Sequence, residues 1–139
     1  MVHVSYPAEA DRRDRFVLDR RSSRPRHDPW RHQGLLVDEE PDAGGEIVRA
    51  ATIFLTGREC PWRCVMCDLW RQTIEQDTPA GAIPHQMAQA IDELRARPGP
   101  FPAHVKLYNA GNFFDPRAVP VADYESIAGR LTNFSRVIV

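Results

Sequence analysis

Apolar residues first form a regular pattern between residues 46 and 57, in the stretch EIVRAATIFLTG. This stretch is rich in residues that favour β-structure, and it ends at Thr56 and Gly57, which together indicate a turn. The pattern therefore predicts a buried strand. Its apolar positions are Ile47, Val48, Ile53, Phe54 and Leu55.

Two amphipathic helices and two more strands are predicted downstream. The first helix is predicted within TPAGAIPHQMAQAIDELRARPGP, residues 78–100, with Pro84 in its first turn and RPGP as a stop signal. A second strand is expected at 104–111, a second helix at 123–134 with Asp123 as its N-cap, and a third strand in RVIV, 136–139. The apolar positions are Ile83, Met87, Ile91 and Leu94 in the first helix, Val105, Leu107 and Tyr108 in the second strand, and Tyr124, Ile127, Leu131 and Phe134 in the second helix.

The alternation of strands and helices predicts a parallel α/β sheet. In such folds, active sites gather at the carboxyl ends of the strands. The loop after the first strand and the loop NAGNFFDPRAVP after the second are therefore expected to face one another over the same edge.

Residues 1–45 differ from the rest because they are charged, broken by prolines and without sustained apolar periodicity. We expect a loosely packed or flexible arm, whose interleaved arginines and aspartates neutralise each other. The predicted organisation is thus a charged, Pro/Arg-rich N-terminal arm at 1–45 followed by a core domain at 46–139.

Bulk properties narrow the class of protein. A chain of 139 residues with 42% hydrophobic residues suits one folded domain, and its net charge of −1 argues against binding polyanions through overall charge. No apolar run has the length of a membrane span, and the N-terminus lacks the apolar centre of a secretory signal. We therefore expect a cytoplasmic protein without membrane contact, in a compartment where thiols stay reduced.

The three cysteines of the chain, Cys60, Cys64 and Cys67, directly follow the first predicted strand. A disulfide would leave one thiol unpaired and is rare in the cytosol. Structural zinc needs four ligands, and the nearest downstream histidine, His85, lies at the start of a predicted helix, so the cysteines alone would leave one position open. A 4Fe–4S cluster fits better, because three thiolates bind three irons and leave the fourth for a substrate or cofactor.

The motif C-x-x-x-C-x-x-C after the first strand of an α/β fold resembles that of the radical S-adenosylmethionine (SAM) superfamily. The resemblance implies a partial (β/α)6 TIM-like barrel in which Cys60, Cys64 and Cys67 bind the 4Fe–4S cluster and SAM binds the open iron. It also implies reductive cleavage of SAM to a 5′-deoxyadenosyl radical, which abstracts a hydrogen atom from the substrate.

The same resemblance assigns cofactor contacts to two loops. Met66 stands where many members carry an aromatic residue against the adenine, and it offers an apolar, polarisable surface instead. Ala110, Gly111 and Asn112 stand where members often have Gly-Gly-Glu, which binds the cofactor's amino group. Asn112 would contribute a neutral acceptor in place of the carboxylate, and Gly111 permits close approach.

The stretch KLYNAGNFFDPRAVP, followed by RVIV, is similar to a narrower group, the archaeosine synthase beta-subunit-like radical SAM proteins, relatives of the elongator catalytic subunit. The pattern is carried by residues 109–114, Asp115, Val119 and Pro120, and the resemblance covers residues 46–139. It implies modification of a transfer RNA nucleoside, a transglycosylase-like partner protein, and flavodoxin or ferredoxin as electron donor.

A complete barrel of this type has more strand–helix units than the two predicted here. We therefore expect the N-terminal portion of the barrel, truncated near its third strand. The alternative is a non-catalytic metal-binding module, an Fe–S relay or a zinc site, or an inactive fragment of a longer radical SAM enzyme. A requirement for SAM distinguishes the enzyme from the module.

Overall fold

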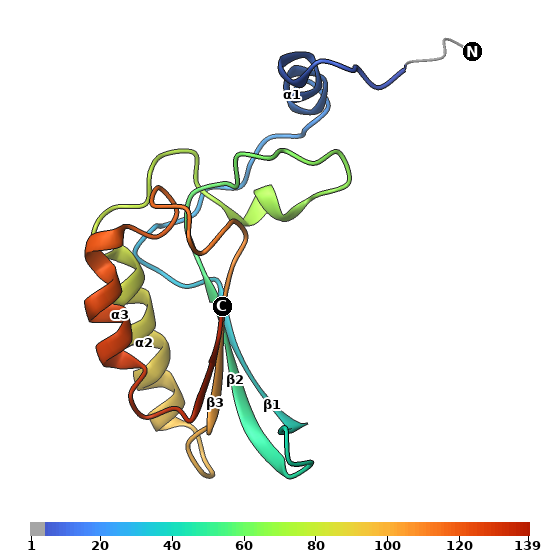
Figure 1. The fold of residues 1–139 in the computed structure, drawn as a ribbon. Helices are drawn as coiled ribbons and strands as arrows, with labels where there is room; N and C mark the ends of the chain where they lie inside the picture. Colours follow the sequence, from blue (N-terminus) through green and yellow to red (C-terminus); the bar gives the residue numbers. More distant parts are fainter. Residues whose placement is uncertain (1–4) are drawn as a thin grey trace.

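The computed structural model describes residues 5–139 as a mixed α/β fold with an open four-stranded sheet and three α-helices (Figure 1). The strands lie in the order β1-β2-β3-β4 across the sheet. In chain order the elements are α1 (Ala10–Leu18), β1 (Gly34–Pro41), β2 (Ile47–Leu55), the 3-10 helix η1 (Leu69–Gln72), α2 (Ala82–Ala96), β3 (His104–Asn109), the 3-10 helix η2 (Val121–Asp123), α3 (Tyr124–Arg130) and β4 (Arg136–Ile138).

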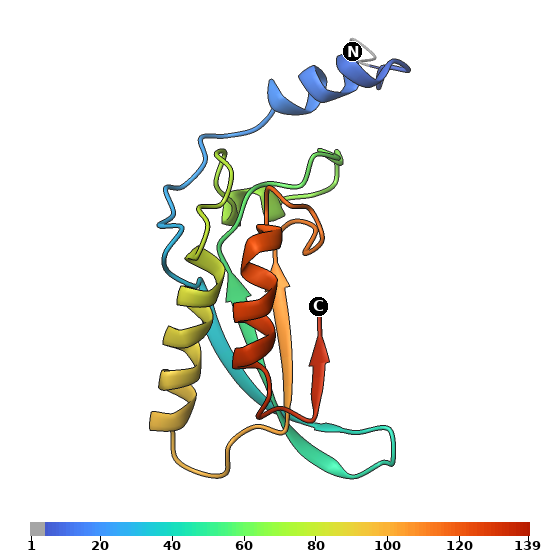
Figure 2. The same ribbon diagram turned by 60° about the vertical axis from the view of Figure 1, so that its left-hand side comes forward.

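Strands β2, β3 and β4 run parallel and alternate with α2 and α3, as the sequence predicts. Both helices cover the same face of the sheet (Figures 1 and 2). The predicted apolar positions of α2 are all buried and form one core with Ile53, Leu55, Val105, Leu107, Ile127 and Phe134. Tyr124 and Leu131 are partly buried against this core, and Val48 and Phe54 are partly buried outside it. Two predicted positions are exposed: Ile47, the first residue of β2, at 65%, and Tyr108 at 47%, because alternation along β3 turns its ring to the opposite face.

Strand β1 is an element that the hydrophobic pattern does not predict, and it lies within the region expected to be a loose arm. It pairs antiparallel with β2 along its whole length, from Gly34 opposite Phe54 to Pro41 opposite Ile47. A tight turn joins the two strands: the Asp42 carboxylate accepts hydrogen bonds from the backbone N–H groups of Gly44 (2.8 Å) and Glu46 (3.0 Å). The sequence of β1, GLLVDEEP, places its apolar residues in one short run followed by three acids, so it gives no alternating signal. Because β1 is antiparallel to β2, the sheet is mixed.

The predicted N-cap of the second helix has a different role. Asp123 occupies the residue before α3, but its side chain makes no capping bond there. Both carboxylate oxygens instead accept the backbone N–H of Gly81, at 2.9 and 3.0 Å, at the start of α2. Asp123 is 6% exposed, so this contact ties the beginnings of the two helices together in a buried position.

The remaining N-terminal segment, residues 5–33, runs past the carboxyl ends of β2 and β3 before entering β1 (Figures 1 and 2). The first four residues of the predicted arm lie outside the described residues. The sheet is open, and the barrel fragment stays a prediction. Within residues 5–139, none of the helices has the length and apolar character needed to cross a membrane.

Candidate functional site

Two long loops leave the same edge of the sheet, and they touch. A Cβ atom added to Gly111, in the loop after β3, would lie 2.9 Å from the backbone oxygen of Arg58 and 3.4 Å from the backbone nitrogen of Cys60. Both neighbours are backbone atoms, so only glycine allows this approach. The predicted juxtaposition of the loops that follow β2 and β3 is therefore confirmed.

Residues 59–74, which we call the cysteine segment, form a loop that is closed at its base. The backbone N–H of Glu59 donates to the carbonyl of Ile74 (3.1 Å), and the N–H of Ile74 donates to the carbonyl of Gly57 (3.0 Å). Below this closure, the buried Gln86 of α2 binds the N–H (2.8 Å) and the carbonyl (2.8 Å) of Thr56. The base of the loop is thus anchored to the core, while its tip extends outward.

Cys60 lies next to the base of this segment, and Cys64 and Cys67 lie further out. None is in a disulfide; Cys60 and Cys67 are partly exposed, and Cys64 is exposed. A left-handed residue, Arg63 with φ 45°, turns the chain before Cys64, and the Cys67 N–H then donates to the Cys64 carbonyl at 3.1 Å. The chain therefore makes a turn between Arg63 and Cys67, which carries the second and third cysteines.

The cysteine segment has the donor atoms of a metal centre but not the converging geometry. Three free thiols on one short, curled loop are the donor set that an iron–sulfur cluster uses. Among residues 5–139, however, no three His, Cys, Asp or Glu side chains converge as a metal site requires. The donors suit a cluster in chemical type and in chain position, and their side chains would have to turn toward one another to bind it.

The residues predicted to contact SAM are placed unequally. Met66 is 83% exposed at the tip of the cysteine segment, with its side chain free for a ligand. The Asn112 side-chain oxygen already accepts the N–H of Phe114 at 3.0 Å, so part of its acceptor capacity serves the loop itself. Gly111 contacts the backbone of Cys60, and Ala110 lines a pocket between the two loops.

That pocket has a volume of about 380 Å³ and an aromatic wall. The rings of Phe54 and Tyr108 meet edge to face, with centroids 5.9 Å apart. Asn109 also lines the pocket, but its side-chain nitrogen is buried without a hydrogen-bond partner within the described structure and lies 3.6 Å from where a Cβ atom of residue 111 would stand. The aromatic wall suits a flat ring. The full lining is Gln33, Phe54, Leu55, Leu69, Gln72, Tyr108, Asn109 and Ala110.

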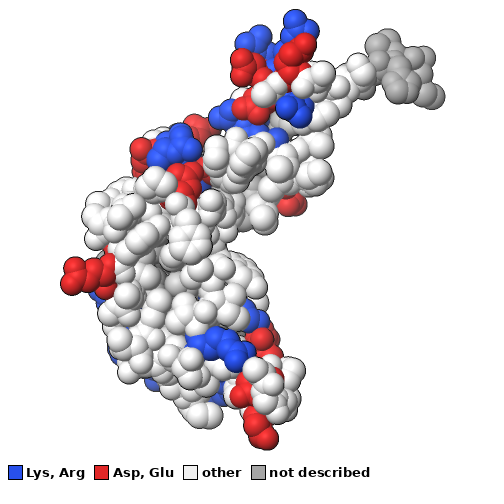
Figure 3. Space-filling view, viewed as in Figure 1, with Lys and Arg blue, Asp and Glu red and all other residues white. Residues whose placement is uncertain are grey.

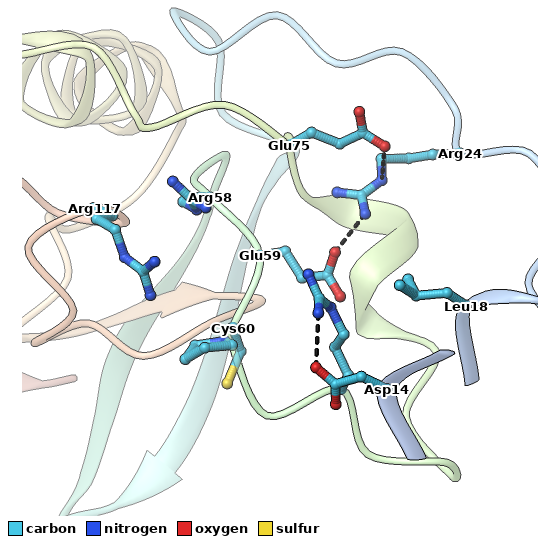
Figure 4. A pocket seen from close by; sticks show the side chains of 10 residues that line it. Asp14, Leu18, Arg24, Arg58, Glu59, Cys60, Glu75 and Arg117 are labelled. Atoms are coloured by element: carbon cyan, nitrogen blue, oxygen red, sulfur yellow. Dashed lines mark hydrogen bonds and ion pairs between the residues drawn. The ribbon is translucent and has the colours of Figure 1, made fainter. Parts of the chain in front are cut away.

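A second cavity, of about 520 Å³, has Cys60 in its wall and is lined mostly by charged residues (Figure 4). Glu59 stands at its centre and forms ion pairs with Arg21 (2.6 Å) and Arg24. Burial raises the pKa of Glu59, but the hydrogen bonds and charges of the two arginines outweigh this and hold its pKa below the ordinary value. The predictions from sequence missed these three residues, and the only available signal was an acid directly before the first cysteine.

Asp115, in the loop after β3, is a structural residue. Its carboxylate accepts the N–H of Arg117 at 3.0 Å, and its carbonyl accepts the N–H groups of Ala118 and Val119 at 2.9 Å. Burial raises the pKa of Asp115, but the hydrogen bonds from the backbone and side chain of Arg117 outweigh this effect. The pKa of Asp115 therefore lies below its ordinary value. The DPRAVP stretch therefore forms a turn that places Val119 in the core.

Comparison of the chain with protein-family models, with curated proteins and with solved structures found no match. The functional assignment therefore depends on the geometry of the two loops and on the chemistry of their side chains.

Proposed function

We propose that Cys60, Cys64 and Cys67 bind a 4Fe–4S cluster and that the chain uses it as a radical SAM protein. When bound, the cluster would supply an electron to the sulfonium of SAM and so generate a 5′-deoxyadenosyl radical. The observation that carries the proposal is the packing of Gly111 on the backbone of Arg58 and Cys60, which brings the cysteine segment and the loop after β3 into contact.

The chain's own residues would divide the work of binding. The three cysteines are the metal ligands, and the exposed Met66 offers an apolar surface beside them. The backbone carbonyl groups around Ala110 and Gly111 would accept hydrogen bonds from the ammonium of the cofactor. Asn112 contributes less than an acidic residue would, because it is neutral and already bonded to Phe114.

We assign the 380 Å³ pocket to a planar base, either the adenine of the cofactor or a nucleobase of the substrate. Its wall of Phe54 and Tyr108 gives dispersion contacts to such a ring. A nucleobase in this pocket agrees with the proposed chemistry on a transfer RNA nucleoside. The transglycosylase-like partner and the flavodoxin or ferredoxin donor belong to the same proposal.

The test is anaerobic reconstitution of the full chain with iron and sulfide, followed by electron paramagnetic resonance of the reduced protein with and without SAM. We expect a reduced-cluster signal that changes when SAM is added. Cys64→Ala should abolish the SAM-sensitive signal, whereas Val65→Ala, at an exposed neighbour in the same turn, should retain it.

Two results would contradict the proposal. A cluster whose spectrum ignores SAM would favour an electron relay. Zinc that co-purifies in place of iron, with no cluster after reconstitution, would favour a metal-binding module of another kind.

A further inference from the structure

The N-terminal segment holds both ends of the cysteine segment with the same two side chains. Arg21 and Arg24 each donate to a different carboxylate oxygen of Glu59, the residue before Cys60. Arg24 also donates to the hydroxyl of Thr73 at 2.8 Å, near the far end of the segment. Both guanidinium groups lie over the ring of Trp70, at 4.8 Å for Arg21 and 5.7 Å for Arg24.

These contacts are shielded from water, unlike most ion pairs of this protein. The side chains of Arg21, Arg24 and Glu59 are 9%, 15% and 14% exposed, and Trp70 is 7% exposed. A carboxylate buried to this degree loses much of its hydration, so removing its cationic partners leaves an unpaired charge in a poor solvent. The contacts therefore constrain the segment more strongly than exposed pairs would.

Further contacts follow the cysteine segment outward. Arg63, between the first two cysteines, pairs with Asp14 of α1 at 2.8 Å. Near the other end, the His27 ring nitrogen lies 2.6 Å from the carbonyl of Arg71, whose side chain donates to Ser22 at 3.1 Å. The N-terminal segment thus accompanies the loop along its length, on the side away from the sheet (Figures 1 and 2).

The arrangement of charge favours a structural use of these arginines over the binding of a polyanion. In the view of Figure 3, basic and acidic side chains are intermixed around α1 and form no single-sign patch. Figure 4 shows Arg24 reaching Glu59 and lying beside Glu75, so its charge is directed at Glu59 in the cysteine segment and at Glu75 directly after it.

We propose that Arg21, Arg24 and Glu59 form a clip that fixes the conformation of the cysteine segment. Glu59 is then a positioning residue: both of its oxygens are occupied by arginines, and its backbone leads directly into Cys60. The clip holds Glu59, which precedes Cys60, next to Trp70 and Thr73, which follow Cys67. It thereby sets the separation between the stretch that carries Cys60 and the stretch that carries Cys67. The consequence for metal binding rests on the proposed function, whereas the conformational part stands without it.

The decisive experiment is amide hydrogen exchange on the full, metal-free chain, comparing the wild type with Arg21→Ala/Arg24→Ala. We expect exchange to accelerate about tenfold or more at the amides of Glu59, Cys67 and Ile74, which are hydrogen-bonded within or beside the segment. Amides of β3 should keep their rates. Arg12→Ala/Arg13→Ala removes the same charge from exposed positions of α1 and should leave all these rates unchanged.

A conservative variant keeps the test meaningful if the double alanine variant unfolds. Arg21→Lys/Arg24→Lys retains both charges but loses the planar, two-pronged donors, so exchange should rise by less than in the alanine variant. Unchanged exchange at Glu59, Cys67 and Ile74 in the folded alanine variant would overturn the clip. A uniform acceleration that includes β3 would also overturn it, because the arginines would then support only the global fold.

Reconstitution separates the two proposals. If the wild type binds a cluster, the clip predicts a faster loss of its absorbance and an altered paramagnetic spectrum in the Arg21→Ala/Arg24→Ala variant, with rescue in the lysine variant. An unchanged spectrum and lifetime would overturn the role of the clip in metal binding and leave the proposed function standing. A wild type that binds no cluster, together with accelerated exchange in the variant, would refute the proposed function and support the conformational clip.

Discussion

The core beneath the candidate site and the cysteine segment above it are stabilised by different kinds of contact. Beneath the site, α2 and strands β2 and β3 form an apolar core, in which Ile53, Ile83 and Met87 are fully buried. Above it, the cysteine segment exposes Trp62 (78%) and Met66 (83%) and is held by ion pairs and hydrogen bonds to a distant part of the chain. The core is therefore a rigid platform, whereas the segment can open locally, as ligand-binding loops generally do.

The largest expected effect is in the platform. Leu107→Ala removes a side chain that is 1% exposed in β3, and the cavity should lower the free energy of unfolding by about 3 kcal/mol. Urea unfolding followed by circular dichroism measures this, with Val121→Ala, at a 63% exposed position, as a near-neutral control. A loss smaller than about 1 kcal/mol would mean that the core repacks freely.

The contact between the two loops gives the next effect. Gly111→Ala places a methyl group 2.9 Å from the Arg58 carbonyl oxygen, so one backbone must move, at a cost of about 2 kcal/mol. Gly129→Ala, in α3, adds the same atom where nothing lies within 4 Å and should stabilise by about 0.5–1 kcal/mol. Opposite signs in thermal unfolding would confirm the close contact; equal shifts would exclude it.

Acid should loosen the cysteine segment before the platform. The pKa of Glu59 is depressed on folding, so its contribution to stability is full above the ordinary value of 4.5 and is lost as the pH falls through the folded pKa. We expect about 1 kcal/mol of local stability to disappear on acidification below pH 4.5, measured by amide exchange at Cys67. Glu59→Gln should remove the pH dependence of local stability that comes from Glu59. The pH dependence that comes from Asp115, whose pKa is also depressed, should remain.

An exposed ion pair on α2 should contribute little to the free energy of unfolding, as most surface ion pairs do. Arg95 lies 3.1 Å from Asp92, with side chains 58% and 75% exposed. Arg95→Ala should change the free energy of unfolding by no more than about 0.5 kcal/mol, with no effect on exchange in residues 59–74. Acceleration of exchange at Glu59, Cys67 and Ile74 as large as in the Arg21→Ala/Arg24→Ala variant would remove the distinction between the buried clip and the exposed pairs.

The sequence by itself determined the platform. The sequence identified α2 through the helical spacing of Ile83, Met87, Ile91 and Leu94. It identified β2 and β3 through β-rich runs before Gly57 and around Leu107. These elements can be predicted because buried positions recur with the period of the helix or strand. The same reasoning predicted that the loops after β2 and β3 meet. It also singled out the three cysteines, whose spacing is a local property.

Only the tertiary structure decided how the cysteine segment is held. Strand β1 has no alternating pattern and is a strand because β2 offers it hydrogen bonds, which local pattern does not record. Asp123 looks like a cap for α3 and instead binds Gly81 at the start of α2. Arg21 and Arg24 resemble the other arginines of the charged arm, and their distinction is a buried partner at Glu59, far away in the chain. Such long-range polar contacts depend on position in space, and no spacing in the sequence encodes them.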